Sequence, residues 1–173
     1  PCLVPASQRR SHKDVQDWCG AYTGKAVVVI CHHGAKLSHG SAAWLRHAGA
    51  DAVSLEDGFE GWKAAGLPLV PVSRLPPRDA AGRTLWVTRS RPKVDRIACP
   101  WLIRRFVDPS AVFLFVAPSE VAGVADRFGA TPFDVEGVFW SHRGGDCTFD
   151  TMIKEFGLAG DALNQLAMIA RGA

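Results

Sequence analysis

Short apolar runs alternate with amphipathic segments in the first 70 residues of the chain. Two runs, Ala26–Ile30 and Ala52–Leu55, have the length of strands, and the first of them, with three valines, is predicted to be fully buried. Helices are predicted from Ser11 and Asp14 onward, at His39–Ala48 before Gly49, and at Phe59–Ala65 before Gly66. Strands that alternate with helices predict an α/β fold with a parallel sheet covered on both faces.

The pattern changes at residues 71–83, where prolines and a glycine replace the apolar periodicity. This composition predicts a linker between a first domain at 1–70 and a second domain at 84–173. The second is expected to be a small α/β or α+β domain. Its predicted strands are Thr84–Thr88 and Ala111–Val116, and its predicted helices are Pro100–Phe106, Ser119–Phe128, Thr148–Phe156 and Asp161–Ala170. The first helix should start at Cys99 or Pro100, because proline is best tolerated in a first turn.

Composition narrows the class of protein. Of 173 residues, 47% are hydrophobic and 21% are charged, which fits a globular protein with a core rather than a disordered chain. No apolar run approaches the roughly 20 residues of a membrane helix. The net charge of +3 is too small to favour nucleic acid as a partner. Five cysteines without short paired spacing fit reduced thiols, so we expect a cytoplasmic protein.

The stretch CHHGAKLS, which follows the first predicted strand, is a candidate thiol site. A cysteine reacts as its thiolate, and backbone N–H groups, a helix N-terminus and a cation all stabilise that form. Cys31 is therefore the candidate nucleophile. The candidate anion-binding residues around it are His32, His33, Gly34, Ala35, Lys36, Leu37 and Ser38. The alternative is that Cys31 is an inert thiol at the end of a buried strand.

Cys31, Gly34, Lys36 and the following serine resemble the active-site loop of rhodanese-type sulfurtransferases. The later LEDGFEGWKAAGLPL, Leu55–Leu69, is similar to the segment that closes that domain. The resemblance implies that Cys31 carries a persulfide between a donor such as thiosulfate and a thiol acceptor. Leu37 is an insertion relative to the commonest form of that loop. The strand and Asp-x-Arg motif that usually open the domain have no match here, so its N-terminal part is expected to be missing.

A second set of candidate residues lies in the second domain, where cations are dense and thiols and a histidine adjoin predicted helix starts. The set comprises Arg89, Asp95, Arg96, Cys99, Trp101, Arg104, Arg105, His142, Arg143, Cys147 and Asp150. The runs WVTR, DRIACPWLIRRF, TPFD, HRG and CTFD resemble the C-terminal domain of the chromate-resistance protein family. That resemblance covers residues 84–170 and implies a link to chromate stress. The family domain normally runs further than Ala173, so a C-terminal truncation is also expected.

Three interpretations of this second set remain open. Cys99, His142 and Cys147 could bind a metal ion, the one cofactor that the sequence suggests. Arg96, Arg104, Arg105, His142 and Arg143 could bind an oxyanion such as chromate or sulfate by charge-assisted hydrogen bonds. The plainest interpretation makes the arginines a solvated face and the cysteines part of the core.

The function that the sequence favours is a rhodanese-type sulfurtransferase associated with chromate resistance. The alternatives are a non-enzymatic chromate sensor or regulator, and a thiol-based chromate reductase using Cys31, Cys99 or Cys147. The expected partners are a small anion (thiosulfate, chromate or sulfate) and a thiol acceptor, without membrane or nucleic acid. An incomplete sheet would expose an edge that a second copy could cover, so a homodimer is also expected.

Overall fold

The computed structural model describes residues 1–172, so Ala173, the last residue of the predicted second domain, lies outside the described residues. The chain divides into two compact units. Residues 8–67 form the first unit, and residues 1–7 together with 68–172 form the second. Both units are mixed α/β and contain parallel strand pairs, which confirms the predicted fold class.

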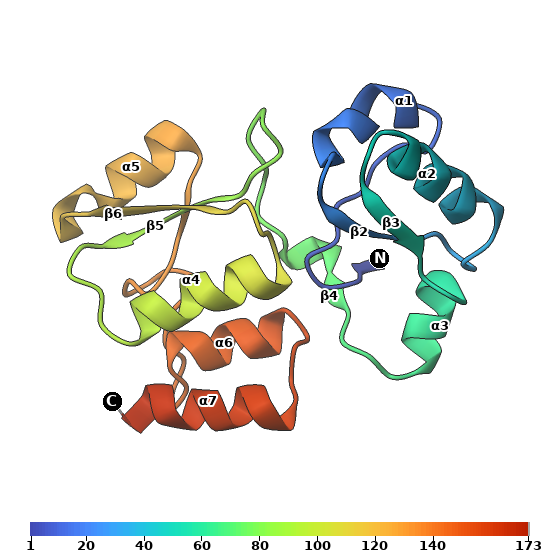
Figure 1. Ribbon diagram of the computed structural model, residues 1–173. Coiled ribbons are helices and arrows are strands. Elements are labelled where there is room, and N and C mark those ends of the chain that lie inside the picture. Colours follow the sequence, from blue (N-terminus) through green and yellow to red (C-terminus); the bar gives the residue numbers. More distant parts are fainter. Residues whose placement is uncertain (173) are drawn as a thin grey trace. The chain divides into compact units, whose positions relative to one another are not determined.

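In the unit of residues 8–67, a pair of parallel strands is packed against helices. Its elements are α1 (Val15–Trp18), the 3-10 turn η1 (Cys19–Tyr22), β2 (Ala26–Val29), α2 (Lys36–His47), β3 (Asp51–Ser54) and α3 (Gly58–Ala64). Figure 1 shows α2 and α1 along one face of the two strands. Val27, Ala52 and Leu45 belong to the core between them.

The other face of this strand pair is open, which corrects the prediction of a fully buried strand and a sheet covered on both sides. Val28 and Val53, which are register partners, have exposed fractions of 56% and 54%. Valine side chains alternate between the two faces of a strand, so only every second valine reaches the core under α2. A run of valines alone therefore does not distinguish a strand buried on both faces from one buried on a single face.

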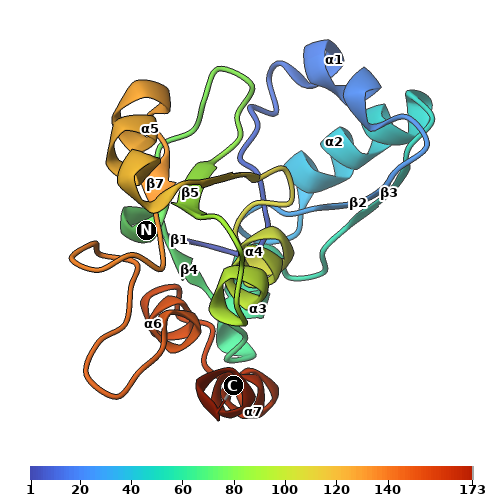
Figure 2. The same ribbon diagram turned by 90° about the vertical axis from the view of Figure 1, so that its left-hand side faces the viewer.

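The second unit is built on a three-stranded parallel sheet in the order β6-β5-β7. Its elements are β1 (Cys2–Leu3), β4 (Val70–Pro71), η2 (Val72–Arg74), β5 (Leu85–Arg89), α4 (Asp95–Phe106), β6 (Val112–Val116), η3 (Pro118–Glu120), α5 (Val121–Phe128), β7 (Thr131–Pro132), α6 (Thr148–Glu155) and α7 (Asp161–Gly172). Figure 1 and Figure 2 show α5 on one side of the sheet and α4 on the other, with α6 and α7 beyond α4.

Neighbouring residues of β5 face opposite cores of this unit. Trp86 is fully buried in the larger core with Leu102 of α4 and Phe149 of α6. Val87 is fully buried in a smaller core with Val121 of α5. Because successive side chains of a strand point to opposite faces, this pair holds helices on both sides of the sheet. The central strand β5 is therefore packed on both faces, and the polar side chains at its carboxyl end are held in place by that packing.

Helix α4 begins earlier than predicted. The sequence placed its start at Cys99 or Pro100, but the helix runs from Asp95 and holds Pro100 in its interior. Proline removes one backbone donor and so costs a hydrogen bond to the carbonyl of Arg96. Arg96 and Cys99 lie in the turn before the proline, and both are buried in this unit. Their burial stabilises the helical conformation of that turn.

The segment predicted as a linker contains ordered structure. β4 pairs antiparallel with β1, and Arg78 forms a bridge with Thr84. The fully buried carboxylate of Asp108 accepts hydrogen bonds from the backbone N–H and the hydroxyl of Thr84, and it lies 3.2 Å from the Arg78 guanidinium. Between residues 1 and 172, no helix combines the length and the apolar character needed to cross a bilayer.

Candidate active site

The thiol of Cys31 lies two residues after β2 and immediately before the loop that leads into α2. The loop covers His32–Ala35, and α2 begins at Lys36. Cys31 is partly exposed, whereas Ser38, in the first turn of α2, is buried. The sulfur is therefore held at the N-terminal end of a twelve-residue helix, where the partial positive charge of the helix favours an anion.

Ser38 is the side chain that contacts the sulfur most directly. Cys31 Sγ lies 3.2 Å from Ser38 Oγ, and that hydroxyl also lies 2.9 Å from the carbonyl oxygen of Ala35. A hydroxyl has one proton to donate. In the thiol state it can donate to Ala35 and accept from the S–H group, and in the thiolate state it can turn to donate to the sulfur. Ser38 thus serves both protonation states without moving its heavy atoms.

The pKa of Cys31 is lowered to about 7. Burial acts against this shift and raises the pKa, but several hydrogen bonds outweigh it. They come from the hydroxyl and the backbone of Ser38 and from the backbone of Ala35 and His33. A substantial fraction of Cys31 is therefore thiolate at neutral pH, which is the form that attacks sulfur or carbon centres.

The loop keeps its shape through close contact with the first turn of α3. The backbone N–H groups of Phe59 and Glu60 donate to the carbonyls of Cys31 and His32, at 2.9 and 3.0 Å. Gly34 and Gly58 both have positive φ, and a Cβ on Gly58 would lie 2.3 Å from the Cys31 carbonyl oxygen. The carbonyls of Cys31 and His32 are thus engaged by α3, while the backbone of His33 and Ala35 faces the sulfur.

The predicted anion-binding residues divide into two groups in the structure. The backbone of His33, Ala35 and Ser38 hydrogen-bonds the sulfur. The side chains of Lys36 and Leu37 are exposed, and the inserted Leu37 extends toward solvent rather than filling the site. His32 Nδ1 lies 3.7 Å from Glu60 of α3. The insertion therefore leaves Ser38 in contact with Cys31.

We expect Ser38→Ala to raise the pKa of Cys31 above about 7, because the variant loses the side-chain hydrogen bond that lowers it. The measurement is the rate of alkylation by iodoacetamide as a function of pH, whose midpoint reports the thiol pKa. The midpoint should move to higher pH in Ser38→Ala. Ser41→Ala, a change at another buried serine of α2, is the matched control and should leave it unchanged. Equal midpoints in wild type and Ser38→Ala would contradict this role for Ser38.

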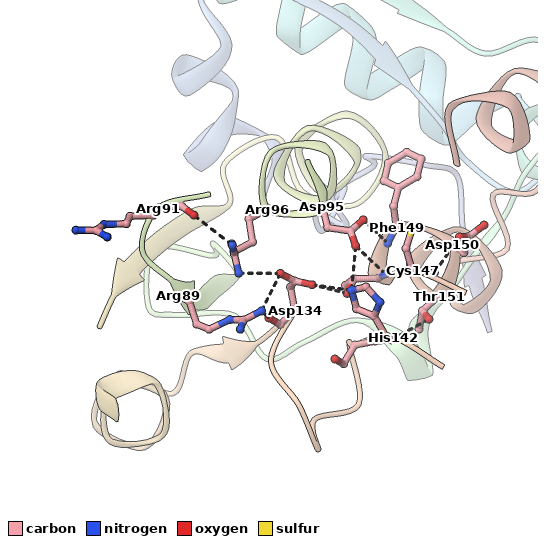
Figure 3. Close-up of polar contacts among 12 residues, drawn as sticks. Arg89, Arg91, Asp95, Arg96, Asp134, His142, Cys147, Phe149, Asp150 and Thr151 are labelled. Atoms are coloured by element: carbon pink, nitrogen blue, oxygen red, sulfur yellow. Dashed lines mark hydrogen bonds and ion pairs between the residues drawn. The ribbon is translucent and has the colours of Figure 1, made fainter. Parts of the chain in front are cut away.

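A second polar cluster lies at the carboxyl ends of β5 and β7, with Asp134 at its centre (Figure 3). Asp134 is 5% exposed and follows β7 in a left-handed backbone conformation, with φ of 51°. Its Oδ2 accepts a hydrogen bond from buried Arg96 at 3.2 Å and lies 3.6 Å from Arg89. Its Oδ1 accepts a hydrogen bond from the Thr148 hydroxyl at 2.8 Å.

Asp95 and His142 complete this cluster. His142 Nε2 lies 3.2 Å from a carboxylate oxygen of Asp95 and 3.2 Å from one of Asp134. Asp95 also accepts hydrogen bonds from the backbone N–H groups of Thr148 and Phe149, at 3.2 and 3.3 Å. Those are the first residues of α6, so Asp95 caps that helix from the start of α4. Three separate segments therefore meet at one imidazole.

The thiols of Cys99 and Cys147 differ sharply from that of Cys31. Burial, followed by the carboxylates of Asp95 and Asp134, raises the pKa of Cys99 well above its ordinary value. Burial is also the main cause that raises the pKa of Cys147 to about 12, with the Asp95 carboxylate adding to it. Both thiols are therefore protonated at neutral pH and poorly suited to nucleophilic or electron-donating chemistry.

The structure brings only part of the second predicted set together. Arg89, Asp95, Arg96 and His142 share one cluster, and Cys99 and Cys147 lie close enough to its carboxylates for their charge to affect both thiols. The other predicted residues have partners or surroundings elsewhere. Trp101 is exposed beside Phe106, Arg104 donates to the Ala111 carbonyl, Arg105 is exposed on the last turn of α4, Arg143 pairs with Glu155, and Asp150 pairs with Arg171.

The positions of these residues can be compared with the predicted oxyanion and metal sets. Arg104 lies eight residues after Arg96 on α4, which at 1.5 Å per residue separates them by about 12 Å along the axis. The group of metal-type donors found among residues 1–172 is Asp95, Asp134 and His142, with no sulfur. His142 is common to that group and to the predicted metal set.

Asp134 was not among the residues predicted from the sequence, although it ends the TPFD run. It follows β7, a strand of two residues that is too short to predict.

Models of known families match both units of the chain. The ChrB C-terminal domain matches residues 86–173, which is half of the chain. The chain belongs to the ChrB C-terminal domain family. A Rhodanese-like domain matches residues 5–65. Both resemblances noted in the sequence are thereby confirmed: the Cys31 loop lies in a rhodanese-like domain, and the Asp134 cluster lies in the ChrB C-terminal domain.

One curated relative matches part of the chain. Protein ChrB of Cupriavidus metallidurans is 40% identical over 90 residues, which cover 52% of this chain and 26% of that protein. The chain thus spans about a quarter of the length of this ChrB protein. No solved structure matches the chain. The ChrB match places Arg89, Asp95, Arg96, Asp134 and His142 in one family domain.

Proposed function

We propose that the chain is a rhodanese-type sulfurtransferase that acts in chromate resistance, with Cys31 as its sulfur carrier. The observation that carries the proposal is a partly exposed thiol with a pKa of about 7, hydrogen-bonded by Ser38 and loop backbone inside a rhodanese-like domain. The link to chromate rests on the ChrB C-terminal domain in the same chain. We expect the protein to act in the cytoplasm, where thiols stay reduced.

The proposed reaction has two steps. In the first, the Cys31 thiolate attacks the outer sulfur of thiosulfate, a new S–S bond forms, and the old S–S bond breaks so that sulfite leaves with the electron pair. In the second, the thiolate of a small thiol acceptor attacks the outer sulfur of the Cys31 persulfide. This step regenerates the Cys31 thiolate and gives the acceptor persulfide. No net oxidation occurs, and no further reactant is needed.

The residues of the loop have distinct roles in these steps. Ser38 and the backbone of His33 and Ala35 stabilise the Cys31 thiolate before attack and the negative persulfide after it. Lys36 is exposed at the first residue of α2, where its ammonium group adds positive charge for an anionic donor and for departing sulfite. Cys31 is partly exposed, so its sulfur can be reached from solvent.

The raised pKa values of Cys99 and Cys147 speak against the alternative of thiol-based chromate reduction at the ChrB C-terminal domain. Two protonated thiols are slow electron donors at neutral pH. A purely binding protein would need no low-pKa thiol, so the lowered pKa of Cys31 favours catalysis over sensing.

The experiment that tests the proposal is a turnover assay with thiosulfate as donor and a small thiol as acceptor, read out as sulfite released. We expect release that rises with pH around 7, because the thiolate form of Cys31 is the reactive one. Release that is absent over the whole pH range would contradict the proposal.

A further inference from the structure

We propose that Asp95, Asp134 and His142 form a binding site for one divalent transition-metal ion in the ChrB C-terminal domain. The proposal is independent of Cys31, since it concerns the other unit of the chain. The three residues come from the start of α4, the segment after β7 and the loop before α6 (Figure 3). Each offers one ligand atom, and these atoms all lie within 4.8 Å of one another.

The two distances that involve His142 match the donor spacing of a coordination shell. His142 Nε2 lies 3.2 Å from a carboxylate oxygen of Asp95 and 3.2 Å from one of Asp134. For metal–ligand bonds of about 2.1 Å, octahedral and tetrahedral angles separate neighbouring donors by roughly 3.0–3.4 Å. The two carboxylate oxygens lie within 4.8 Å of each other, so an ion beside His142 Nε2 can contact all three atoms once the carboxylates close around it.

His142 Nε2 faces two carboxylate oxygens, one of Asp95 and one of Asp134. His142 Nε2 carries at most one proton, whatever the charge of the ring. One N–H group cannot make two well-directed bonds to carboxylates on different segments. The two carboxylates also repel each other, and Asp134 is 5% exposed. A divalent cation gives both carboxylates and the imidazole nitrogen a partner at once.

The carboxylates are oriented as metal-binding carboxylates are in proteins. The Thr148 hydroxyl donates to Asp134 Oδ1 at 2.8 Å, and the backbone N–H groups of Thr148 and Phe149 hold Asp95. Outer hydrogen bonds of this kind fix the ligand oxygens and tune their affinity. The start of α6 therefore orders both acidic ligands, and the ion would join α4 to the loop that carries His142.

Two further observations point to a ligand at this place. The cluster lies at the carboxyl ends of β5 and β7, the edge of a parallel sheet where α/β proteins bind ligands. Arg96, 7% exposed, holds Asp134 Oδ2, whereas the other carboxylate oxygen, Oδ1, faces His142 Nε2.

The donor set selects the kind of ion. One imidazole with two carboxylates suits Zn²⁺, Fe²⁺ or Mn²⁺, whereas Ca²⁺ and Mg²⁺ favour sites made of oxygen alone. Three protein donors, one of them a histidine with 59% of its side chain exposed, leave coordination positions open to solvent. Arg89 and Arg96 reduce the negative charge of Asp134, which lowers the affinity for any cation. We expect Zn²⁺ to bind more tightly than Mn²⁺, because that is the general affinity order at sites with nitrogen and oxygen ligands.

The test is a titration of the metal-free full chain with Zn²⁺ and with Mn²⁺, with bound metal measured by equilibrium dialysis and elemental analysis. All proteins carry Cys31→Ser, which removes the reactive thiol as a competing ligand. We expect one equivalent of Zn²⁺ in this background. Loss of a ligand in His142→Ala, and separately in Asp95→Asn, should weaken binding at least about tenfold. His47→Ala, at an exposed histidine of α2, is the control and should bind as its parent does.

Circular dichroism of each metal-free variant verifies that it is folded. Co²⁺ supplies a second readout, because its visible spectrum should change when the His142 nitrogen is lost. Absence of a bound equivalent in the parent protein would overturn the proposal. So would a bound equivalent whose affinity is the same in His142→Ala, Asp95→Asn and His47→Ala.

Discussion

Replacement of Cys31 by serine is expected to abolish sulfur transfer from thiosulfate and to leave the fold intact. A serine hydroxyl is not ionised at neutral pH and cannot hold a transferable sulfur, so both proposed steps are lost together. Removal of a catalytic nucleophile lowers the rate by at least about four orders of magnitude. The measurement is the initial rate of sulfite release at pH 7.5 under saturating thiosulfate.

Cys2→Ser is the matched control, because Cys2 is an exposed thiol in the other unit. It should retain the wild-type rate of sulfite release. Activity that survives in Cys31→Ser and disappears in Cys2→Ser would remove Cys31 from the mechanism. Thermal melting curves of both variants, compared with that of the wild type, distinguish a loss of chemistry from a loss of folded protein.

Asp134→Ala is expected to have the largest effect on stability, lowering the free energy of unfolding by about 3–5 kcal/mol. Asp134 is the carboxylate that pairs with buried Arg96 and also accepts from Thr148. Its removal leaves the Arg96 guanidinium buried without an opposing charge, which costs more than the hydrogen bonds alone. The measurement is urea unfolding followed by circular dichroism and by tryptophan fluorescence.

Asp146→Ala provides the comparison for that measurement. Asp146 forms an ion pair with Lys154, whose side chain is 63% exposed. An exposed pair of this kind contributes about 0–1 kcal/mol. If the two variants lose similar stability, the Asp134 cluster does not hold the ChrB C-terminal domain together. Trp86 and Trp140 lie in the core of that domain, and the other unit holds Trp18, Trp44 and Trp62, so the fluorescence signal combines the transitions of both units.

The elements of the fold that could be predicted are those with a local signature. Glycines at 49 and 66 ended two predicted helices within about a residue of the observed ends, because positive φ is cheap only for glycine. The strand at Ala26–Val29 was found by its valines, but the exposed face at Val28 was not. Which face a strand buries depends on what packs on it, and that information lies elsewhere in the chain. The predicted homodimer stays a prediction.

The two sites also differ in how much of each could be predicted from the sequence. The Cys31 site lies in one run of eight residues, so its thiol, its loop and Ser38 could all be named from the sequence. The Asp134 cluster combines residues between 89 and 148 through the parallel pairing of β5 with β7. β7 has only two residues and one is a proline, so no hydrophobic periodicity predicted the strand that positions Asp134. Charge density pointed to Arg104 and Arg105 instead, which lie at the other end of α4.

The most direct test of the sulfurtransferase proposal is the intact mass of the protein after incubation with thiosulfate and removal of the excess. We expect wild-type protein to gain about 32 Da, the mass of one sulfur atom on Cys31, and to lose it when a small thiol is added. Cys31→Ser should gain nothing under the same conditions. A wild-type mass that does not change, or a gain that persists in Cys31→Ser, would contradict the role of Cys31 as the sulfur carrier.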